Sequence, residues 1–454
     1  MRSAMKPHEL ITPWKGDKRY TDIARRAAAL KKAGSSAEQI VAALTAEFGA
    51  PVQLLGLRDV PAPAHVFGTV GDKDTPAGVA DIEPGAYAQL QLALRLPIAI
   101  QGALLPDAHQ GYALPIGGVF RSYNSVAPAM VGVDIACRMM LTVFTAPPEE
   151  VRQRRDELFS LLKQVTTFGV GVERAYAADH AVLEDPRWGA TSQLRGLRDR
   201  AAKQLGTSGA GNHFAELVVG ETLQALIPGA PHAFAGLLTH SGSRGVGYAI
   251  ANHYMRVAEQ ETKRIARIPR YYEWLDLDSE AGQVYWTSME LAGAFASANH
   301  HVIHDLFLRR SKLGVAAQVE NHHNFAWRQG DLVVHRKGAT PAAAGELGII
   351  PGSMATASYV VVGSGNGESL MSTSHGAGRR GSRTWARNTI SMRDVQRVLA
   401  ERDVLVEGVV ADESPFAYKD IERVMTIQEQ AGLLERVARM QPIAVLMAGE
   451  EGED

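Results

Sequence analysis

Candidate catalytic and metal-binding residues are spread along most of this chain, in short motifs rich in glycine or asparagine. If these motifs meet at a single site, the strands and helices between them have to interleave in space. We therefore expect the chain from about residue 85 onward to form one domain, although its length of 454 residues alone would suggest two or three. The motifs lie at residues 106–118, 131–138, 206–216, 239–247, 321–324, 336–354 and 374–384.

The chain is predicted to have a fold of the α+β class. A single large interleaved domain of mixed sheets and helices is expected over residues 85–449, with an N-terminal helical extension over residues 1–60 and a disordered acidic tail at residues 450–454. Apolar spacing predicts helices at 148–164, 245–267, 285–312 and 393–402. Short apolar runs predict strands at Val131–Val133, Leu237–Thr239, Leu332–Val334 and Tyr359–Val362.

Residues 20–48 of the extension are predicted to form a helical hairpin. Ile23 and Ala27 have helical spacing, and a capping box of Ser35 with Glu38 is expected to begin the second helix. Such a hairpin could bind a partner or RNA, but a simple packing appendage is the favoured interpretation. Residues 60–80, rich in Pro, Gly and Asp, are predicted to be a linker or loop.

Composition and charge indicate the compartment of the protein and how it could contact a substrate. A single cysteine, the lack of an apolar run long enough to span a bilayer and the lack of an export signal favour a cytoplasmic protein without a membrane partner. The formal net charge of −2 gives no overall attraction to nucleic acid. Any contact with RNA is therefore expected from local basic patches, such as Arg379, Arg380, Arg383 and Arg387.

The one cysteine, Cys137, lies three residues after Asp134 in a turn that follows a glycine. A lone thiol can be a metal ligand, a nucleophile or a small buried hydrophobic group. Thiolate, imidazole and carboxylate groups together are the usual ligands of zinc and other divalent transition metals, and a thiolate can bridge two ions. No spacing here is a self-contained metal motif, so a metal site and a buried thiol both stay open. The candidate imidazole ligands are His213, His240 and one of the adjacent His322 and His323, since an extended backbone would point only one of these two inward.

Three flexible loops, each beside a histidine, predict a polyanionic substrate. Glycine-rich loops with hydroxyls or arginines are typical phosphate-binding segments, although any one of them alone could be a plain turn. His375 is a candidate nucleophile toward phosphorus, with Arg379 to neutralise charge, and a buried, hydrogen-bonded histidine is the alternative. The loops are Gly206–His213, Ser241–Gly245 and Gly376–Arg379, and a Walker-type loop is absent from the sequence.

Together, these motifs resemble the RtcB family of RNA ligases over roughly residues 85–449. The resemblance is carried by Pro106–Gly111, Val131–Cys137, Gly209–Glu216, His240–Gly247, His322–Asn324, Arg336–Thr340, Ile350–Met354 and Ser374–Arg383. It implies an enzyme that uses GTP and manganese to join an RNA end carrying a 3′-phosphate or 2′,3′-cyclic phosphate to a 5′-hydroxyl end, in tRNA splicing or RNA repair. It also admits an archease-like activator as a partner.

The resemblance implies roles for individual residues. His375 matches the histidine that is guanylylated, and Asp107 and His109 match a motif near the site. Asn212 falls where the family contacts phosphate, and Glu216 where it contacts guanine. Two manganese ions are implied at Asp134, Cys137, His213, His240 and His323. GTP is implied at Asn212, Glu216, Asn324, Ser353, Ala377, Gly378, Arg379 and Tyr418.

Two features depart from the family pattern: the end of the chain, and the hairpin at residues 20–48, which has no match in the pattern. Family members usually end in a Lys-Gly pair whose lysine reaches the guanine, whereas this chain has Met447 there, with Lys419 the nearest alternative lysine. Ligand softness alone would favour zinc over manganese at a cysteine–histidine site. Two other functions compete with the ligase: a metal-dependent phosphoesterase without the guanylylation step, and a non-catalytic protein that binds RNA ends. The full set of metal ligands and nucleophile favours the ligase, because a binding protein needs no such set.

Overall fold

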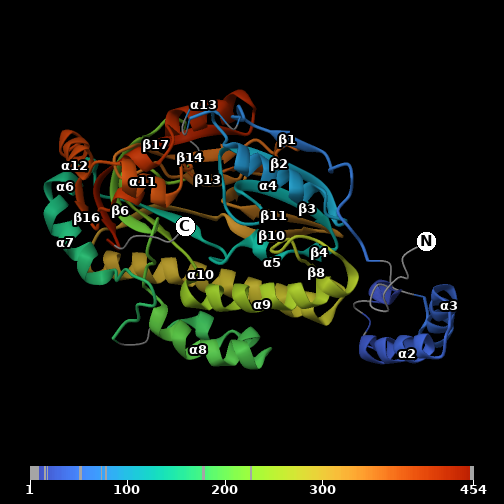
Figure 1. Ribbon diagram of the computed structural model, residues 1–454. Coiled ribbons are helices and arrows are strands. Elements are labelled where there is room, and N and C mark those ends of the chain that lie inside the picture. Colours follow the sequence, from blue (N-terminus) through green and yellow to red (C-terminus); the bar gives the residue numbers. More distant parts are fainter. Residues whose placement is uncertain are drawn as a thin grey trace.

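Two large β-sheets, flanked by helices, make up most of the molecule (Figure 1). The computed structural model describes residues 10–14, 17, 19–50, 54–72, 74–76, 79–175, 179–224 and 227–449. Segments far apart in the sequence are neighbours in both sheets, so the chain interleaves rather than forming consecutive units. This arrangement confirms the predicted α+β fold with an N-terminal helical extension.

The larger sheet has the strand order β13-β14-β17-β6-β7-β5-β9, and β16 pairs with β17 beside this path. Its strands are antiparallel to their neighbours except β16, which runs parallel to β17. Its central strands are buried along nearly their whole length because other layers cover both faces, so they read as apolar runs rather than alternating patterns. The bounds are β5 (Arg138–Phe144), β6 (Phe214–Thr222), β7 (Ala233–Ser241), β9 (Val315–His322), β13 (Leu347–Ile350), β14 (Ser358–Gly363), β16 (Leu405–Glu407) and β17 (Leu434–Met447).

The smaller sheet has the order β1-β2-β3-β11-β10, and two short ribbons, β12-β15 and β4-β8, lie beside it. Strand β2 ends at His109, and β15 ends directly before His375. Because β15 contacts β2, these two motifs become neighbours in space. The bounds are β1 (Ala64–Val66), β2 (Ala99–His109), β3 (Ile116–Tyr123), β4 (Ser125–Val126), β8 (Leu275–Asp276), β10 (Asn324–Gln329), β11 (Leu332–Lys337), β12 (Ala339–Pro341) and β15 (Ser372–Ser374).

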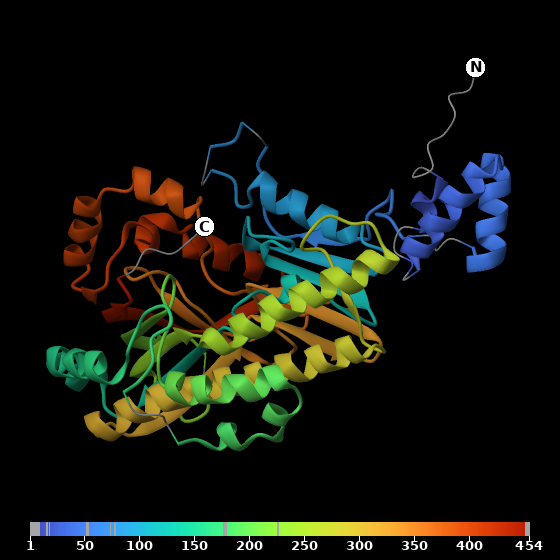
Figure 2. The same ribbon diagram turned by 60° about the horizontal axis from the view of Figure 1, so that its bottom comes forward.

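Two long helices, α9 (Arg244–Ile265) and α10 (Glu280–Ser311), lie side by side along one side of the sheets (Figures 1 and 2). Helix α8 (Ser192–Gln204) packs against both, and α10 also contacts strands β5 and β7. The other helices are α4 (Pro84–Leu94), α5 (Pro128–Val131), α6 (Pro148–Gln153), α7 (Arg155–Val165), α11 (Arg383–Thr389), α12 (Met392–Glu401) and α13 (Ile421–Gln430). Short 3₁₀ helices lie at Thr12–Trp14, Ala181–Glu184, Pro186–Gly189, Ala411–Glu413 and Pro415–Ala417.

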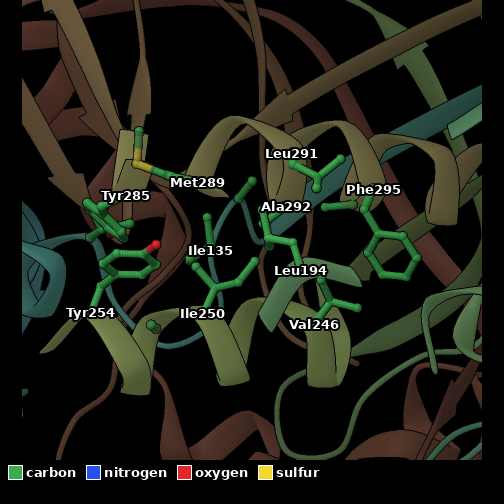
Figure 3. Packing of buried hydrophobic residues seen from close by; sticks show 14 of the residues in the cluster. Ile135, Leu194, Val246, Ile250, Tyr254, Tyr285, Met289, Leu291, Ala292 and Phe295 are labelled. Atoms are coloured by element: carbon green, nitrogen blue, oxygen red, sulfur yellow. The ribbon is translucent and has the colours of Figure 1, made fainter. Parts of the chain in front are cut away.

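The hydrophobic core between α8, α9 and α10 also holds the turn that carries Cys137. Figure 3 shows Ile135 lying among Ile250 of α9 and Ala292 of α10, and its side chain is fully buried. Burying an isoleucine stabilises the folded state by about 1.5–3 kcal/mol. Since Ile135 directly follows Asp134, this packing fixes the backbone from which both Asp134 and Cys137 project.

The N-terminal extension has a hydrophobic core of its own, in which Trp14 is buried between α2 (Tyr20–Lys32) and α3 (Ala37–Phe48). It stands to one side of the sheets (Figure 2). The predicted hairpin is therefore present, but the predicted capping box is wrong by one residue. The Ser36 hydroxyl accepts from the backbone N–H of Gln39, whose side chain accepts from the N–H of Ser36.

The sequence predicted the long helices well and one strand wrongly. Each predicted helix is present, and the first is divided at Arg154 into α6 and α7. The strand predicted at Val131–Val133 is wrong, because Pro128 begins the short helix α5 and Gly132, at φ +103°, then turns the chain. The predicted tail at residues 450–454 lies outside the described residues. No helix within the described ranges has both the length and the apolar character needed to cross a membrane.

Candidate active site

Five side chains converge at one end of four neighbouring strands of the larger sheet. The strand register explains why. Phe214, which follows His213, lies opposite His240; His240 lies opposite Met139; and Arg138, which follows Cys137, lies opposite His322. Antiparallel pairing thus brings the starts of β5 and β6 to the same edge as the ends of β7 and β9. The converging side chains are Asp134, Cys137, His213, His240 and His323.

Their ligand atoms form two overlapping groups that share Cys137. The Cys137 Sγ lies 3.1 Å from His240 Nε2, which is 3.2 Å from His323 Nε2. On the other side, the Cys137 Sγ lies 3.4 Å from His213 Nε2, which is 3.0 Å from Asp134 Oδ2. Within each group all ligand atoms are within 4.8 Å of one another. A thiolate shared by two ligand groups is the arrangement expected for two bridged ions.

The protonation of the imidazoles suits this cluster to bind metal. His240 Nδ1 donates to the carbonyl oxygen of Asn212 at 2.9 Å, so its Nε2 carries a lone pair directed at the cluster. Burial, reinforced by the nearby His213, lowers the pKa of His240 to about 3, and burial also holds the pKa of His323 well below its ordinary value. Both rings are therefore neutral at physiological pH, the form in which histidine binds metal ions.

The acid and the thiol of the cluster are shifted in opposite directions. Desolvation alone would raise the pKa of Asp134, but its hydrogen bond to His213, the charge of His213 and a contact with Cys137 together outweigh this and lower the pKa. Burial, together with the charge of Asp134, raises the pKa of the Cys137 thiol. A bound divalent cation would reverse the second shift, because metal ligation deprotonates a thiol. The donor set therefore fits divalent metal ions.

Backbone contacts hold the turns that carry these ligands. The N–H of His323 donates to the carbonyl of Cys137 at 3.0 Å, and the N–H and hydroxyl of Ser243 both donate to Asp134 Oδ1. The predicted phosphate loop Ser241–Gly245 therefore orients the aspartate and lies outside the lining of the pocket described below. The Asn324 side chain also holds this turn, because it donates to the Asp134 carbonyl and accepts from the N–H of Gly338.

His375 lies next to the metal-ligand cluster and is held by a buried carboxylate. Its ring centroid is 5.0 Å from that of His323. Asp107 Oδ2 accepts from His375 Nδ1 at 2.7 Å and from the His375 backbone N–H at 3.1 Å. Burial would raise the pKa of Asp107, but the hydrogen bond to His375 and the positive charges of His375 and Lys419 together outweigh it and lower the pKa. With Nδ1 donating to a carboxylate, His375 keeps Nε2 as the free, nucleophilic nitrogen.

Glycine allows the loop after His375 to pass directly over β2. Gly378 has φ +74°, and a Cβ at this position would collide with the carbonyl oxygen of Asp107. Any side chain here would therefore push the His375 loop away from its carboxylate partner. This explains why the motif after His375 needs a glycine at this position.

A pocket of about 670 Å³ opens in front of His375 and has room for a nucleotide. The predicted nucleotide residues all line it except Asn324, which lies behind the cluster. Its lining includes Tyr112, Asn212, Phe214, Glu216, His240, Gly352, Ser353, Met354, His375, Gly376, Ala377, Gly378, Arg379, Arg383, Glu413, Tyr418, Val445 and Met447.

Arg379 gives the pocket unused hydrogen-bond donors. Its guanidinium lies 5.6 Å from the centroid of the Tyr418 ring, and Nη1 is 3.7 Å from Glu413. Both terminal nitrogens are buried, and neither makes a hydrogen bond within the described part of the chain. Because buried donors are normally satisfied, these two point to an anionic ligand such as a phosphate.

Another wall of the pocket is built by the pairing of β6 with β17. Glu216 lies opposite Val445, and Phe214 lies opposite Met447, so all four side chains share one face of the sheet. Glu216 is 3 % exposed, and burial raises its pKa to about 8. Lysine is absent among the described residues of the lining, and the ammonium of Lys419 instead donates to the carbonyls of Pro106 and Ala108. Met447 therefore occupies the wall at which the family pattern predicts a lysine.

Comparison with known proteins agrees with this geometry. A family model described as tRNA-splicing ligase RtcB matches residues 89–448. The chain belongs to the RtcB family. The RNA-splicing ligase RtcB of Escherichia coli K12 is 32 % identical over 382 residues, covering 76 % of this chain and 90 % of that protein. The tRNA-splicing ligase RtcB of Thermococcus kodakarensis is 31 % identical over 417 residues, covering 75 % and 86 % of the two chains. The RNA-splicing ligase RtcB of Mycobacterium tuberculosis is 30 % identical, covering 75 % and 95 %.

Two of the four arginines predicted for RNA contact pair with buried acids in this RtcB protein. Arg383 and Arg387 form ion pairs with Asp412, at 2.8 Å and 3.3 Å, and Arg383 also pairs with Glu413. Asp412 and Glu413 are almost fully buried, so the arginines neutralise charges inside the protein. Arg380 is exposed and Arg379 keeps unused donors, so RNA contact from this group stays a prediction, while Arg383 and Arg387 are engaged inside the protein.

Sequence reasoning missed two supporting roles in the RtcB site. Asp107 was matched to a motif without a role, and Ser243 was seen only as part of a glycine-rich loop. A signal for Asp107 was present, since an acid inside a buried strand needs a partner that offsets its desolvation. The position of Ser243 depends on the approach of α9 to the cysteine turn, which the sequence does not indicate.

Proposed function

We propose that this protein is a GTP- and manganese-dependent RNA ligase that joins 3′-phosphate or 2′,3′-cyclic phosphate RNA ends to 5′-hydroxyl ends. His375 Nε2 attacks the α-phosphorus of GTP, a nitrogen–phosphorus bond forms and pyrophosphate leaves. The RNA 3′-phosphate then takes the guanylate, and the 5′-hydroxyl displaces GMP as the new phosphodiester forms. A cyclic phosphate is first opened by water.

One observation carries this proposal: a histidine with a free Nε2 lies between a metal-ligand cluster and unused arginine donors, inside one pocket. Asp107 keeps the proton on His375 Nδ1 and offsets the positive charge that develops on the ring as Nε2 bonds to phosphorus. Arg379 supplies donors for phosphate oxygens. These are the positioning and charge-neutralising tasks on which phosphoryl transfer depends.

The two ligand groups that share Cys137 would hold two manganese ions. Bound there, divalent ions would neutralise phosphate charge and lower the pKa of a water molecule. Ligand softness favours zinc at such a site, so the preference for manganese rests on membership of the RtcB family. Metal analysis of protein loaded with equal manganese and zinc, with labelling measured on each form, tests this part of the proposal.

Labelling with GTP tests the ligase against a phosphoesterase. The protein is incubated with manganese and GTP labelled on the α-phosphate, separated on a denaturing gel and mapped by peptide mass. We expect label on the peptide that contains His375, and loss of that label when RNA with a 3′-phosphate and a 5′-hydroxyl is added. Release of phosphate from RNA without protein labelling would contradict the guanylylation step. Faster labelling on addition of an archease-like protein would support such a protein as an activator.

A further inference from the structure

A second cavity, of about 430 Å³, opens on the surface between α9, α5 and the loop that follows α9. Side chains spaced along one face of α9 form one wall, and the loop residues form the other. The lining includes Tyr248, Asn252 and Arg256 of α9, with Arg270 and Tyr271 of the loop. None of them lines the nucleotide pocket.

Two tyrosine rings at this cavity are exposed to solvent. Tyr248 is 60 % exposed, and Tyr271 is 37 % exposed. The backbone of Tyr271 has φ +75°, a conformation that costs free energy for a residue with a large side chain. The guanidinium of Arg270 lies 4.6 Å from the centroid of the Tyr271 ring. The loop therefore presents an aromatic ring and a cation together. Because the Tyr271 ring is partly exposed, burial in the core does not account for the backbone strain at this residue.

The aromatic surface continues into the catalytic pocket. The ring of Tyr112 lies 5.6 Å from the ring of Tyr271, and Tyr112 also lines the pocket in front of His375. The Lys337 ammonium lies 3.4 Å from the centroid of the Tyr112 ring and donates to the carbonyl oxygens of Tyr112 and Ala129, which fixes this tyrosine in place. Tyr112 is thus a rigid wall shared by the catalytic pocket and the approach to the second cavity.

A basic segment of the chain borders this cavity, whose own lining holds two arginines, Arg256 and Arg270, and two glutamates, Glu259 and Glu273. Between Arg256 and Arg270 the chain has five basic residues and two acidic ones, a local charge of +3 against −2 for the whole chain. The two acids, Glu259 and Glu261, pair with Lys263 and Arg264. Within the described ranges, Arg256, Arg267 and Arg270 form no ion pair. Of the acids that line the cavity, Glu259 is the paired one and Glu273 is buried.

We propose that this face binds single-stranded RNA on its way to the catalytic pocket, with a base stacked on Tyr248 or Tyr271 and phosphates on Arg256 and Arg270. This inference rests on the proposed ligase function and names a contact site for its substrate. Exposed aromatic rings beside unpaired arginines are the pattern by which proteins bind single strands without reading sequence. An apolar ligand would leave these arginines without a partner.

Fluorescent RNA tests the stacking directly. Single-stranded RNA oligonucleotides with a 3′-phosphate carry 2-aminopurine at successive positions from the 3′ end, and fluorescence is titrated with manganese-loaded protein. We expect quenching at one or two neighbouring positions only. Tyr248→Ala and Tyr271→Gly should remove quenching at those positions and weaken binding about tenfold. Tyr248→Phe, which keeps a stacking ring, should restore both. Glycine is chosen at 271 because it adopts φ +75° without strain.

Matched controls separate this face from the rest of the surface. Tyr123→Ala removes another exposed tyrosine, and Arg152→Gln removes an exposed arginine on α6; neither should change RNA affinity. Arg256→Gln and Arg270→Gln should each lower the slope of log affinity against log salt by roughly 0.7. Equal quenching in wild type and both tyrosine variants, or equal losses in the controls, would overturn the inference. GTP labelling of wild-type protein is measured in parallel, and its failure would contradict the ligase proposal whatever the stacking result.

Discussion

The pocket in front of His375 has two ends that differ in how fully their chemistry is specified. At the metal end, which reaches the pocket through His240, four ligand groups surround the thiol of Cys137, and a backbone carbonyl, a backbone N–H and a hydroxyl fix the orientation of two of them. At the base end, two strands supply Phe214, Glu216, Val445 and Met447, and Glu216 is the one polar group among these four. The metal end is therefore constrained by coordination geometry, and the base end by little more than shape and one acid.

This difference shows which functions tolerate substitution. Removing one ligand from a buried cluster leaves the remaining groups without a partner, so the chemistry fails as a unit. Under the proposed function, changing a wall residue at the base end would alter which base fits and would leave the reacting atoms where they are. We expect substitutions at the metal end and at His375 to abolish function, and substitutions at the base end to shift selectivity or stability by moderate factors.

The largest effect is expected for His375→Ala. Because His375 is the proposed acceptor of guanylate, the variant should take up no label from GTP, while its manganese content stays close to that of wild type. Denaturing gels and metal analysis on the same samples measure both. Label on the alanine variant would show that another residue is the acceptor.

Two adjacent histidines provide a matched pair at the metal end. His323 points into the cluster, whereas the ring of His322 stacks on Trp327 with centroids 5.0 Å apart. His323→Ala should lose at least one bound ion and all labelling, and His322→Ala should keep both. In wild type, bound metal should also protect Cys137 from alkylation until a chelator is added. Equal metal content in the two variants would argue against His323 as a ligand.

A smaller loss of activity is expected when the partner of His375 is neutralised. Asp107→Asn keeps the shape of the side chain but removes the charge that holds the His375 proton. A hydrogen bond to a charged group is worth about 1.5–3 kcal/mol, so the labelling rate should fall roughly ten- to a hundredfold. Substrate affinity for GTP should change little. A large loss of GTP binding with an unchanged labelling rate would place Asp107 in binding rather than in activating His375.

Coordination chemistry also explains what could be predicted from the sequence. Asp134 and Cys137 could be predicted as a pair because an i, i+3 spacing across a tight turn brings ligands together, and the alternation of an extended backbone indicated that one of His322 and His323 points inward. Interleaving of the domain followed from the spread of the motifs. The ion pairs that neutralise Arg383 depend on where α11 packs against residues 411–413, which no local pattern reveals.

The buried acid at the base end should make the stability of the folded protein depend on pH. Burial raises the pKa of Glu216 to about 8, whereas an unfolded glutamate titrates near about 4.3. Between these values the folded protein holds a proton that the unfolded chain releases, so stability is full below the unfolded pKa and is lost as pH rises toward 8. Glu216→Gln should therefore be more stable than wild type at pH 8.5, by about 2–4 kcal/mol, and similar at pH 5. Denaturant unfolding of metal-free protein measures this, with the exposed Glu221→Gln as the unchanged control.

The smallest effect is expected for Met447→Lys, which tests whether the base end selects the nucleotide base. Met447 lies diagonally across the strand pair from Glu216, so a lysine there can reach both the acid and the edge of a bound base. A lysine that donates to the guanine carbonyl discriminates against adenine, whose amino group would face it donor to donor. Wild type, which has only Glu216 for this task, should accept ATP measurably beside GTP. Met447→Lys should raise the ratio of GTP to ATP labelling about tenfold, while Met447→Leu, which adds no charge, should leave it unchanged.

If ATP labelling of wild type is undetectable, or if both variants give the same ratio, base selection in this protein lies outside the β6–β17 wall. Lys419→Met then becomes the informative substitution: a sharp fall in the ratio would show that a lysine under the His375 loop moves to the base when nucleotide binds.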